Sequence, residues 1–295
     1  MPALLVVLAL SCGDDSTKHE DVTWVWTAER TGGPNLISTW AYAADGVFVI
    51  GREGTILRHD GSEWTEMASG VSVVLASVWG SAVNNVFAVG EAGTILHYDG
   101  AAWTPMNSGT TVYLHGVWGS AGNDVYAVGD GGTILHYDGA EWTSETSGTE
   151  TVLLSLWGSS PDDVIVVGQE GVFLHYDGSE WTPMASEITS RISEIWGAAP
   201  DDIFAVGAYR IMHYDGSEWT IMAEVDTGWL GGVAGRTGTD VFAVGQGAAV
   251  WHYDGDAWTV MTAVTESNLA DVCVLPGGEI LAVGSGGTIL RYAPE

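Results

Sequence analysis

Short apolar runs separated by Gly, Asn and Asp follow one another along the chain from about residue 23 onward, and no window shows a helical period. Residues 113–144 are typical. The stretches 113–118, 124–128, 133–137 and 141–144 are rich in β-branched and aromatic residues, and turn-forming residues separate them. This pattern predicts an all-β fold built from groups of four short strands.

The four-strand pattern returns at an almost constant interval. An Asp-Gly pair, most often preceded by His-Tyr, recurs with spacings of 39, 39, 39, 38 and 39 residues. Its aspartates are Asp60, Asp99, Asp138, Asp177, Asp215 and Asp254. A second marker, resembling Val-Phe-Ala-Val-Gly, ends at Gly51, Gly90, Gly129, Gly168, Gly207, Gly245 and Gly284. Seven such units predict a seven-bladed β-propeller of four-stranded blades over residues 23–295.

The two ends of the repeat region complement each other. The last unit stops at residues 291–295, before any fourth strand, whereas residues 23–27 resemble that missing strand. Trp26 and Thr27 match Trp64 and Thr65 of the following unit. We therefore predict that residues 22–28, with 23–28 as the strand itself, close the last blade and remove two exposed sheet edges.

Charge narrows the range of partners. The chain carries 38 Asp and Glu against 8 Lys and Arg, a net charge of −30. A nucleic-acid partner requires a basic surface, so this class is excluded, and an anionic lipid surface is repelled. The charge indicates either a well-solvated surface or affinity for cationic partners.

The N-terminal residues predict export. Residues 3–10 form an apolar run too short to span a bilayer. The stretch Leu8-Ala9-Leu10-Ser11-Cys12 resembles the lipobox of bacterial lipoproteins, and Asp14 and Asp15 follow closely. The resemblance implies a signal peptide over residues 1–11, a lipidated Cys12 and an acidic tether over 12–22, with membrane contact only through the lipid. The protein is then a cell-envelope lipoprotein of the outer membrane or cell surface; the alternative is a secreted protein with a non-lipidated signal.

Six Asp-Gly-x-x-Trp segments carry a second resemblance, which spans residues 23–293. They run from each aspartate of the repeat to Trp64, Trp103, Trp142, Trp181, Trp219 and Trp258. They are similar to the bacterial BNR and Asp-box propellers and, more distantly, to WD40-like propellers. Such relatives include secreted binding modules and glycosidases. The sialidases among them use three converging arginines, for which this chain offers Arg30, Arg52, Arg58, Arg191, Arg210, Arg236 and Arg291.

The repeated polar residues are interpreted as structural. Asp-Gly between two strands favours a type I′ turn, in which the aspartate caps nearby amides, over a calcium site. The repeat histidines lie on third strands, too far apart to bind one metal ion, and we expect them to be satisfied between blades. They are His97, His136, His175, His213 and His252.

The tryptophans are interpreted in the same way. They form two rings, which we expect to pack between blades rather than to bind sugars. The inner ring contains Trp40, Trp79, Trp118, Trp157 and Trp196, and Ala234 and Cys273 occupy the equivalent positions of units 6 and 7. Cys273 is therefore expected to be a buried, inert thiol.

The candidate ligand site lies where the repeat breaks. In units 5 and 6 one loop loses a residue, and these units introduce Glu194, Tyr209, Arg210, Asp226 and Trp229. Together they offer a guanidinium group, carboxylates and aromatic surface, although local drift in a tolerant loop is the alternative.

No catalytic residue, metal site or cofactor is predicted. The favoured function is a monomeric, non-enzymatic binding or scaffolding propeller for an unknown protein or glycan ligand. The alternative is a carbohydrate-active propeller, either a lectin or a sialidase-like glycoside hydrolase.

Overall fold

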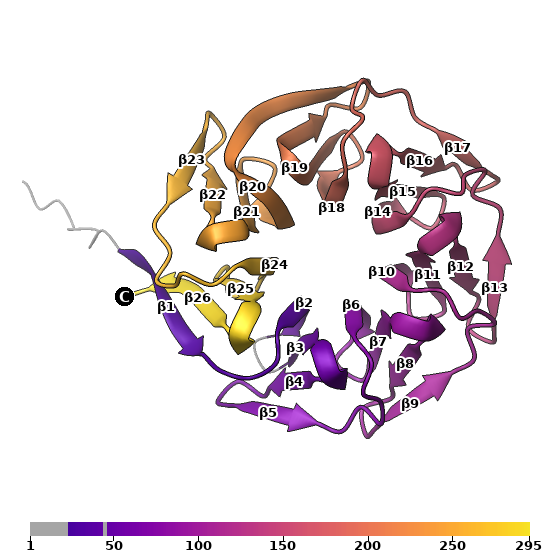
Figure 1. Cartoon of the computed structure of the whole chain (residues 1–295), viewed down its shortest axis with the longest axis horizontal. Coiled ribbons are helices and arrows are strands. Elements are labelled where there is room, and N and C mark those ends of the chain that lie inside the picture. The colour runs from indigo at the N-terminus through magenta and orange to yellow at the C-terminus, as the bar shows by residue number, and fades with distance from the viewer. Residues whose placement is uncertain (1–22, 44–45) are drawn as a thin grey trace, which may run out of the picture.

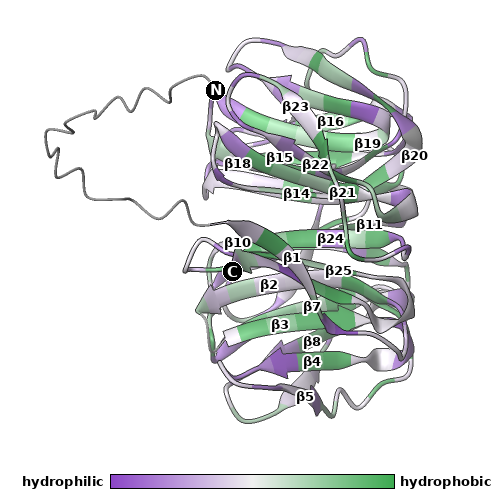
Figure 2. Cartoon of the chain, turned by 90° about the vertical axis from the view of Figure 1, so that its left-hand side faces the viewer, coloured by the Kyte–Doolittle hydropathy of each residue, from purple (hydrophilic) through white to green (hydrophobic). Residues whose placement is uncertain are grey.

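A closed ring of antiparallel β-sheets makes up the molecule (Figure 1). The structure is a computed structural model that describes residues 23–43 and 46–295. The first strand of each blade lies at the ring's centre and the fourth at its rim, and in the edge view the hydrophobic residues follow the strands (Figure 2). Within the described residues no helix has the length and apolar character needed to cross a membrane. The expected signal peptide, Cys12 and tether lie outside this part of the chain.

The strands of each blade follow one another in sequence. Blades 1 and 2 contain β2 (Leu36–Ala43), β3 (Gly46–Gly51), β4 (Ile56–His59), β5 (Trp64–Met67), β6 (Leu75–Ala82), β7 (Asn85–Gly90), β8 (Ile95–Tyr98) and β9 (Trp103–Met106). Blades 3 and 4 contain β10 (Leu114–Ala121), β11 (Asp124–Gly129), β12 (Ile134–Tyr137), β13 (Trp142–Glu145), β14 (Leu153–Ser160), β15 (Asp163–Gly168), β16 (Phe173–Tyr176) and β17 (Trp181–Pro183). Blades 5 and 6 contain β18 (Ile192–Ala199), β19 (Asp202–Tyr214), β20 (Trp219–Thr237), β21 (Asp240–Gly245), β22 (Val250–Tyr253) and β23 (Trp258–Met261). Blade 7 contains β24 (Leu269–Val274), β25 (Ile280–Gly284), β26 (Ile289–Pro294) and β1 (Trp24–Arg30). Six short 3-10 turns join second to third strands: η1 (Arg52–Gly54), η2 (Glu91–Gly93), η3 (Asp130–Gly132), η4 (Gln169–Gly171), η5 (Gln246–Ala248) and η6 (Ser285–Gly287).

The prediction of a seven-bladed propeller is confirmed, with one local difference in blades 5 and 6. Five sheets have four strands, and the sixth has six because β19 and β20 each serve as two strands. The loop between the second and third strands of blade 5 is one residue shorter than in the other blades, so β19 runs through it without a 3-10 turn. Within β19, Tyr209 is the one residue with a left-handed conformation (φ 63°). β20 continues from the rim of blade 5 to the centre of blade 6 (Figure 1). The two blades are therefore joined as one sheet.

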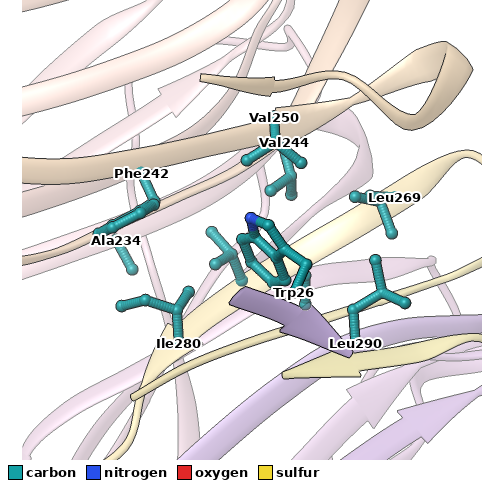
Figure 3. Close-up of a cluster of buried hydrophobic side chains, with 10 residues drawn as sticks. Trp26, Ala234, Phe242, Val244, Val250, Leu269, Ile280 and Leu290 are labelled. Atoms are coloured by element: carbon teal, nitrogen blue, oxygen red, sulfur yellow. The ribbon is translucent and has the colours of Figure 1, made fainter. Parts of the chain in front are cut away.

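The N-terminal strand closes the ring, as predicted. β1 pairs antiparallel with β26 from Trp24 opposite Pro294 to Arg30 opposite Ile289. The Trp26 indole enters the apolar cluster between blades 6 and 7 and is 6% exposed (Figure 3). The ring centroids of Trp26 and Tyr292 lie 5.1 Å apart. Both ends of the chain thus contribute to one blade.

Tryptophan and glycine interlock at five of the seven blade interfaces. A Cβ atom added to Gly158 on β14 would lie only 2.5 Å from Cη2 of Trp118 on β10. The indole of one blade therefore occupies the space that a side chain would need on the next. The interlocked pairs are Trp40–Gly80, Trp79–Gly119, Trp118–Gly158, Trp157–Gly197 and Trp196–Gly235. At the other two interfaces Ala234 and Cys273 replace the tryptophan, and the following blades carry Val274 and Ala41 in place of the glycine. A smaller residue on one blade is therefore matched by a larger one on the next.

The outer tryptophans also pack between blades, as expected. Trp103 of blade 2 meets the Phe48 ring of blade 1 edge-on, with the two centroids 5.9 Å apart. Trp142, Trp181 and Trp258 repeat this arrangement against Phe87, Tyr126 and Phe204. Their faces are used in packing and are not free platforms for sugars.

The type I′ turns occur at a different loop from the one predicted. At an Asp-Gly turn only the glycine has a positive φ (95° at Gly61), whereas a type I′ turn needs two consecutive residues there. Asp60 accepts hydrogen bonds at Oδ1 from the amides of Ser62 and Glu63, at 2.9 and 3.0 Å, and holds both in place. The I′ geometry lies in the 3-10 turns, where Glu53 and Gly54 have φ of 62° and 69°.

Candidate functional site

A channel along the ring's axis is the main cavity of the described part of the chain. Its volume is about 750 Å³, and all seven first strands line it. At the second position of these strands, apolar Ile37, Ala76 and Leu154 lie on blades 1, 2 and 4, whereas His115 and Ser193 lie on blades 3 and 5. Around the channel wall, the polar residues of blades 3 and 5 therefore alternate with the apolar residues of blades 1, 2 and 4.

The third position of the first strand links neighbouring blades. The Ser38 hydroxyl accepts a hydrogen bond from the Val78 amide at 3.3 Å, and the Ser77 hydroxyl accepts one from Val117 at 3.2 Å. In blade 7 the position is Asp271, whose carboxylate accepts from the Thr39 amide at 2.7 Å. In blades 1, 2 and 7 a short polar side chain at this position thus satisfies an amide of the next blade.

Glu194 occupies the same third position in blade 5. It is half-buried in the channel wall, and no hydrogen bond joins its carboxyl to another described residue. Burial, and after it the charge of Asp271, raises the pKa of Glu194 well above its usual value. Burial also raises the pKa of Asp271 to about 6, despite hydrogen bonds from Thr39, Val272 and Ser38. The negative charge of Asp271 therefore disfavours ionisation of Glu194.

One mouth of the channel carries a group of larger polar and aromatic side chains. His115 Nε2 lies 2.8 Å from the Asp130 carboxylate, and the Tyr113 ring stacks on the imidazole at 4.4 Å between centroids. Arg191 and Trp229 line the channel from blades 5 and 6, and Trp229 is 39% exposed. Tyr113 immediately precedes β10, and Arg191 immediately precedes β18. These side chains therefore surround the end of the channel where the first strands begin.

The structure divides the five predicted site residues into two groups. Glu194 and Trp229 both line the channel. Tyr209 and Asp226 are exposed and do not line it, and neither does the half-buried Arg210. Fusion of the strands in β19 places Arg210 opposite Glu224 within the sheet, and the neighbouring Ala208 lies opposite Trp229.

Asp271, Tyr113, His115 and Arg191 also line the channel and were not among the predicted site residues. Asp271 could have been found, because aligning the first strands puts it at the position of Glu194. His115 stands where the other repeats have Ile, Ala, Leu, Ser or Gly, which is a weaker signal of the same kind.

The repeat histidines are satisfied inside their own blades and not between blades as expected. His136 Nε2 lies 2.6 Å from the Asp124 carboxylate on the neighbouring strand, and the imidazole stacks on Tyr126 at 4.3 Å between centroids. His175, His213 and His252 pair with Asp163, Asp202 and Asp240, and His97 pairs with Asn85. Two strands that run side by side bring these residues together, so no partner from another blade is needed. The residues that the structure describes include no group of three or more potential metal ligands.

Arginines do not converge as a sialidase site requires. Arg236 pairs with Asp240 at 2.8 Å, and Arg291 pairs with Glu279 at 2.6 Å and with Glu29. Among the described arginines, only Arg191 lines the channel. Cys273 also lines it and is half-buried rather than buried as expected; burial of the thiol raises its pKa to about 12, so the group is uncharged and a poor nucleophile.

Comparison with known proteins supports the fold and gives no family. No family model and no curated protein matches the chain. A solved structure described as YCF48 bound to D1 peptide has a TM-score of 0.74 at 16% identity, covering 92% of this chain and 97% of the other. YCF48 from Cyanidioschyzon merolae gives a TM-score of 0.71 at 16% identity, covering 90% and 98%. The WD40 propeller domain of Doa1 gives 0.78 at 10% identity, covering 93% and 98%. At such identities the likeness establishes that the chain has the WD40-like β-propeller fold.

Proposed function

We propose that this protein is an exported binding propeller that takes a polypeptide partner at the channel mouth formed by Tyr113, His115, Arg191 and Trp229. The single observation that carries the proposal is this mouth, where exposed Arg191 and Trp229 and half-buried Tyr113 and His115 surround a cavity of about 750 Å³. Trp, Tyr and Arg are the residues that most often dominate protein-binding sites. A propeller of the same overall shape has been solved with a bound peptide, which supports a polypeptide as the ligand class.

The proposal includes anchoring of the chain to the cell envelope by a lipid on Cys12. Its support is the lipobox-like stretch Leu8-Ala9-Leu10-Ser11-Cys12. Cys12→Ser expressed in a bacterial host should lose labelling by a fatty-acid analogue and move from the membrane to the soluble fraction. Labelling that persists in the variant, or is absent from the parent, rules out this anchor.

Binding is tested with the full chain in detergent micelles, panned against a random-peptide display library and applied to a glycan array. Enriched peptides should bind Tyr113→Ala and Trp229→Ala about tenfold or more weakly than the parent. Tyr42→Ala is the matched control, because Tyr42 is an exposed aromatic residue (53%) outside the channel.

Unchanged binding by both mouth variants places the site elsewhere. Glycan binding without peptide binding favours the carbohydrate-binding alternative. Turnover of chromogenic glycosides, lost in a channel variant, contradicts a purely binding role.

A further inference from the structure

The fifth position of the first strands forms a ring of indoles around the channel. All five tryptophans of this ring are half-buried and line the channel, and so do the two smaller residues that complete the ring. The ring contains Trp40, Trp79, Trp118, Trp157 and Trp196, then Ala234 in blade 6 and Cys273 in blade 7. At about 3.3 Å per residue, Trp118 lies about 16 Å along its strand from Tyr113 at the mouth. The indole ring therefore belongs to the other end of the channel.

The ring is open beside blades 6, 7 and 1. In blades 2 to 5 an indole of the preceding blade covers the sixth position of the first strand, so this position does not line the channel. The covered residues are Gly80, Gly119, Gly158 and Gly197. In blades 6, 7 and 1 the sixth position does line the channel, and its residues are Gly235, Val274 and Ala41. The channel thus extends one residue farther along three neighbouring blades.

The residues at the two interfaces without tryptophan do not fill this extra space. Ala234 with Val274, and Cys273 with Ala41, contain fewer than half as many side-chain heavy atoms as tryptophan with glycine. All four of these residues line the channel. They form, with Gly235 and between Trp196 and Trp40, a widening of the channel that we call the indole recess.

The indole recess is apolar. Its nearest polar groups are the Thr39 hydroxyl and the Cys273 thiol, whose Oγ1 and Sγ atoms lie 3.5 Å apart. The ionisable side chains that line the channel are closer to the mouth, apart from the uncharged thiol: His115, Arg191, Glu194 and Asp271. A charged ligand would lose its hydration in the recess without compensation, and the net charge of −30 repels anions.

The geometry points to a binding site for a small, uncharged and mainly apolar molecule in the channel, with its deepest part in the indole recess. This inference goes beyond the polypeptide site at the mouth and does not depend on it. Small-molecule sites have volumes of about 300–1,000 Å³ and largely apolar or aromatic walls with a few polar groups. A channel of about 750 Å³ with five indoles at one end has these properties.

The indoles are already held in place before a ligand arrives. At the edge of the recess, a Cβ atom added to Gly235 would lie 2.7 Å from Cη2 of Trp196, so the ring is in close contact with the backbone of the next blade. Binding against such fixed rings costs little side-chain entropy.

The test uses two fluorescent probes with one skeleton: uncharged phenylnaphthylamine and anionic anilinonaphthalene sulfonate. Both are titrated into the full chain carrying Cys12→Ser, purified without detergent because micelles would take up the probes. This parent should bind the uncharged probe about tenfold or more tightly than the sulfonate. The methyl NMR signals of Ala234 and Val274 should shift on binding, which locates the probe without any change in the recess.

Restoring the missing tryptophan should close the site. Ala234→Trp combined with Val274→Gly reproduces the pair found at five interfaces and should weaken binding of the uncharged probe about tenfold or more in a folded chain. Cys273→Trp combined with Ala41→Gly does the same at the next interface and serves as the second variant. Val260→Trp is the matched control, because it adds an indole at a rim position that is 67% exposed and outside the channel, and it should bind like the parent.

Unchanged affinity for the uncharged probe in either folded double variant overturns the inference, as does binding that leaves the Ala234 and Val274 methyl signals in place. Equal affinity for the two probes refutes the uncharged ligand class. A parent that binds neither probe refutes the site, because the channel then holds only water.

Discussion

Ring closure by the N-terminal strand can be tested by truncating one side chain. Trp26→Ala removes an indole that is 6% exposed and packs against Phe242, Leu269 and Tyr292. A tryptophan buries about 200 Å², and at about 25 cal/mol per Å² its loss corresponds to about 5 kcal/mol, within the usual range of about 3–5 kcal/mol for Trp→Ala in a core. We expect a loss of this size in the free energy of unfolding, measured by urea titration.

The matched control is Trp103→Ala, because Trp103 is 7% exposed and holds the equivalent position in blade 2. Both variants should lose similar stability. Only Trp26→Ala should also speed hydrogen exchange at the β26 amides, since β1 is the edge strand of blade 7 and pairs there with β26. Unchanged stability and unchanged β26 exchange in Trp26→Ala would show that the strand does not close the ring in solution.

Three further predictions concern the channel and the blade interfaces. The pKa of Asp271 is about 6 in the folded state and about 3.8 when unfolded, so the folded chain binds the extra proton between these values and stability falls as pH rises through them. Asp271→Asn should therefore match the parent near pH 4 and exceed it by about 3 kcal/mol at pH 7 in chemical denaturation, and a constant difference refutes the linkage. Gly158→Ala should cost about 1–3 kcal/mol because its Cβ would lie 2.5 Å from the preceding blade's indole, whereas Gly277→Ala, with open space around it, should cost little. In a Cys12→Ser background, Cys273 should react with iodoacetamide at pH 8 about a hundredfold or more slowly than in the unfolded chain, and equal rates would contradict its raised pKa.

The architecture was predictable from the sequence because each packing rule is repeated. A tryptophan in one unit and a glycine about one repeat later, such as Trp118 and Gly158, specify the same interface several times, so a single substitution does not hide the pattern. The closing strand was predictable for the same reason, since Trp26 and Thr27 match a position that the last unit lacks.

Turn geometry was harder to predict from the sequence, because the Asp-Gly dipeptide is compatible with more than one type of turn. The outcome depends on where the aspartate directs its carboxylate: in this protein Asp60 binds two amides of its own loop, and Ser62 keeps a negative φ. A dipeptide rule does not contain that information.

The site was only partly predictable, because departures from a repeat mark unusual positions without giving their direction in space. Glu194 and Trp229 face the channel, whereas Arg210 is taken into a strand when β19 runs through the shortened loop. Asp271 was missed, although aligning the first strand of blade 7 through Cys273 puts it at the position of Glu194.

The composition of blade 7 also makes ring closure a long-range folding step. Its outer strand precedes blades 1 to 6 in the chain and its inner three strands follow them, so a contact such as Thr27 with Arg291 spans 264 residues. Such long-range contacts form slowly, and until this one forms Trp24–Arg30 is an unpaired strand. An unpaired strand with apolar side chains attracts other chains, so rapid ring closure protects the folding protein from aggregation.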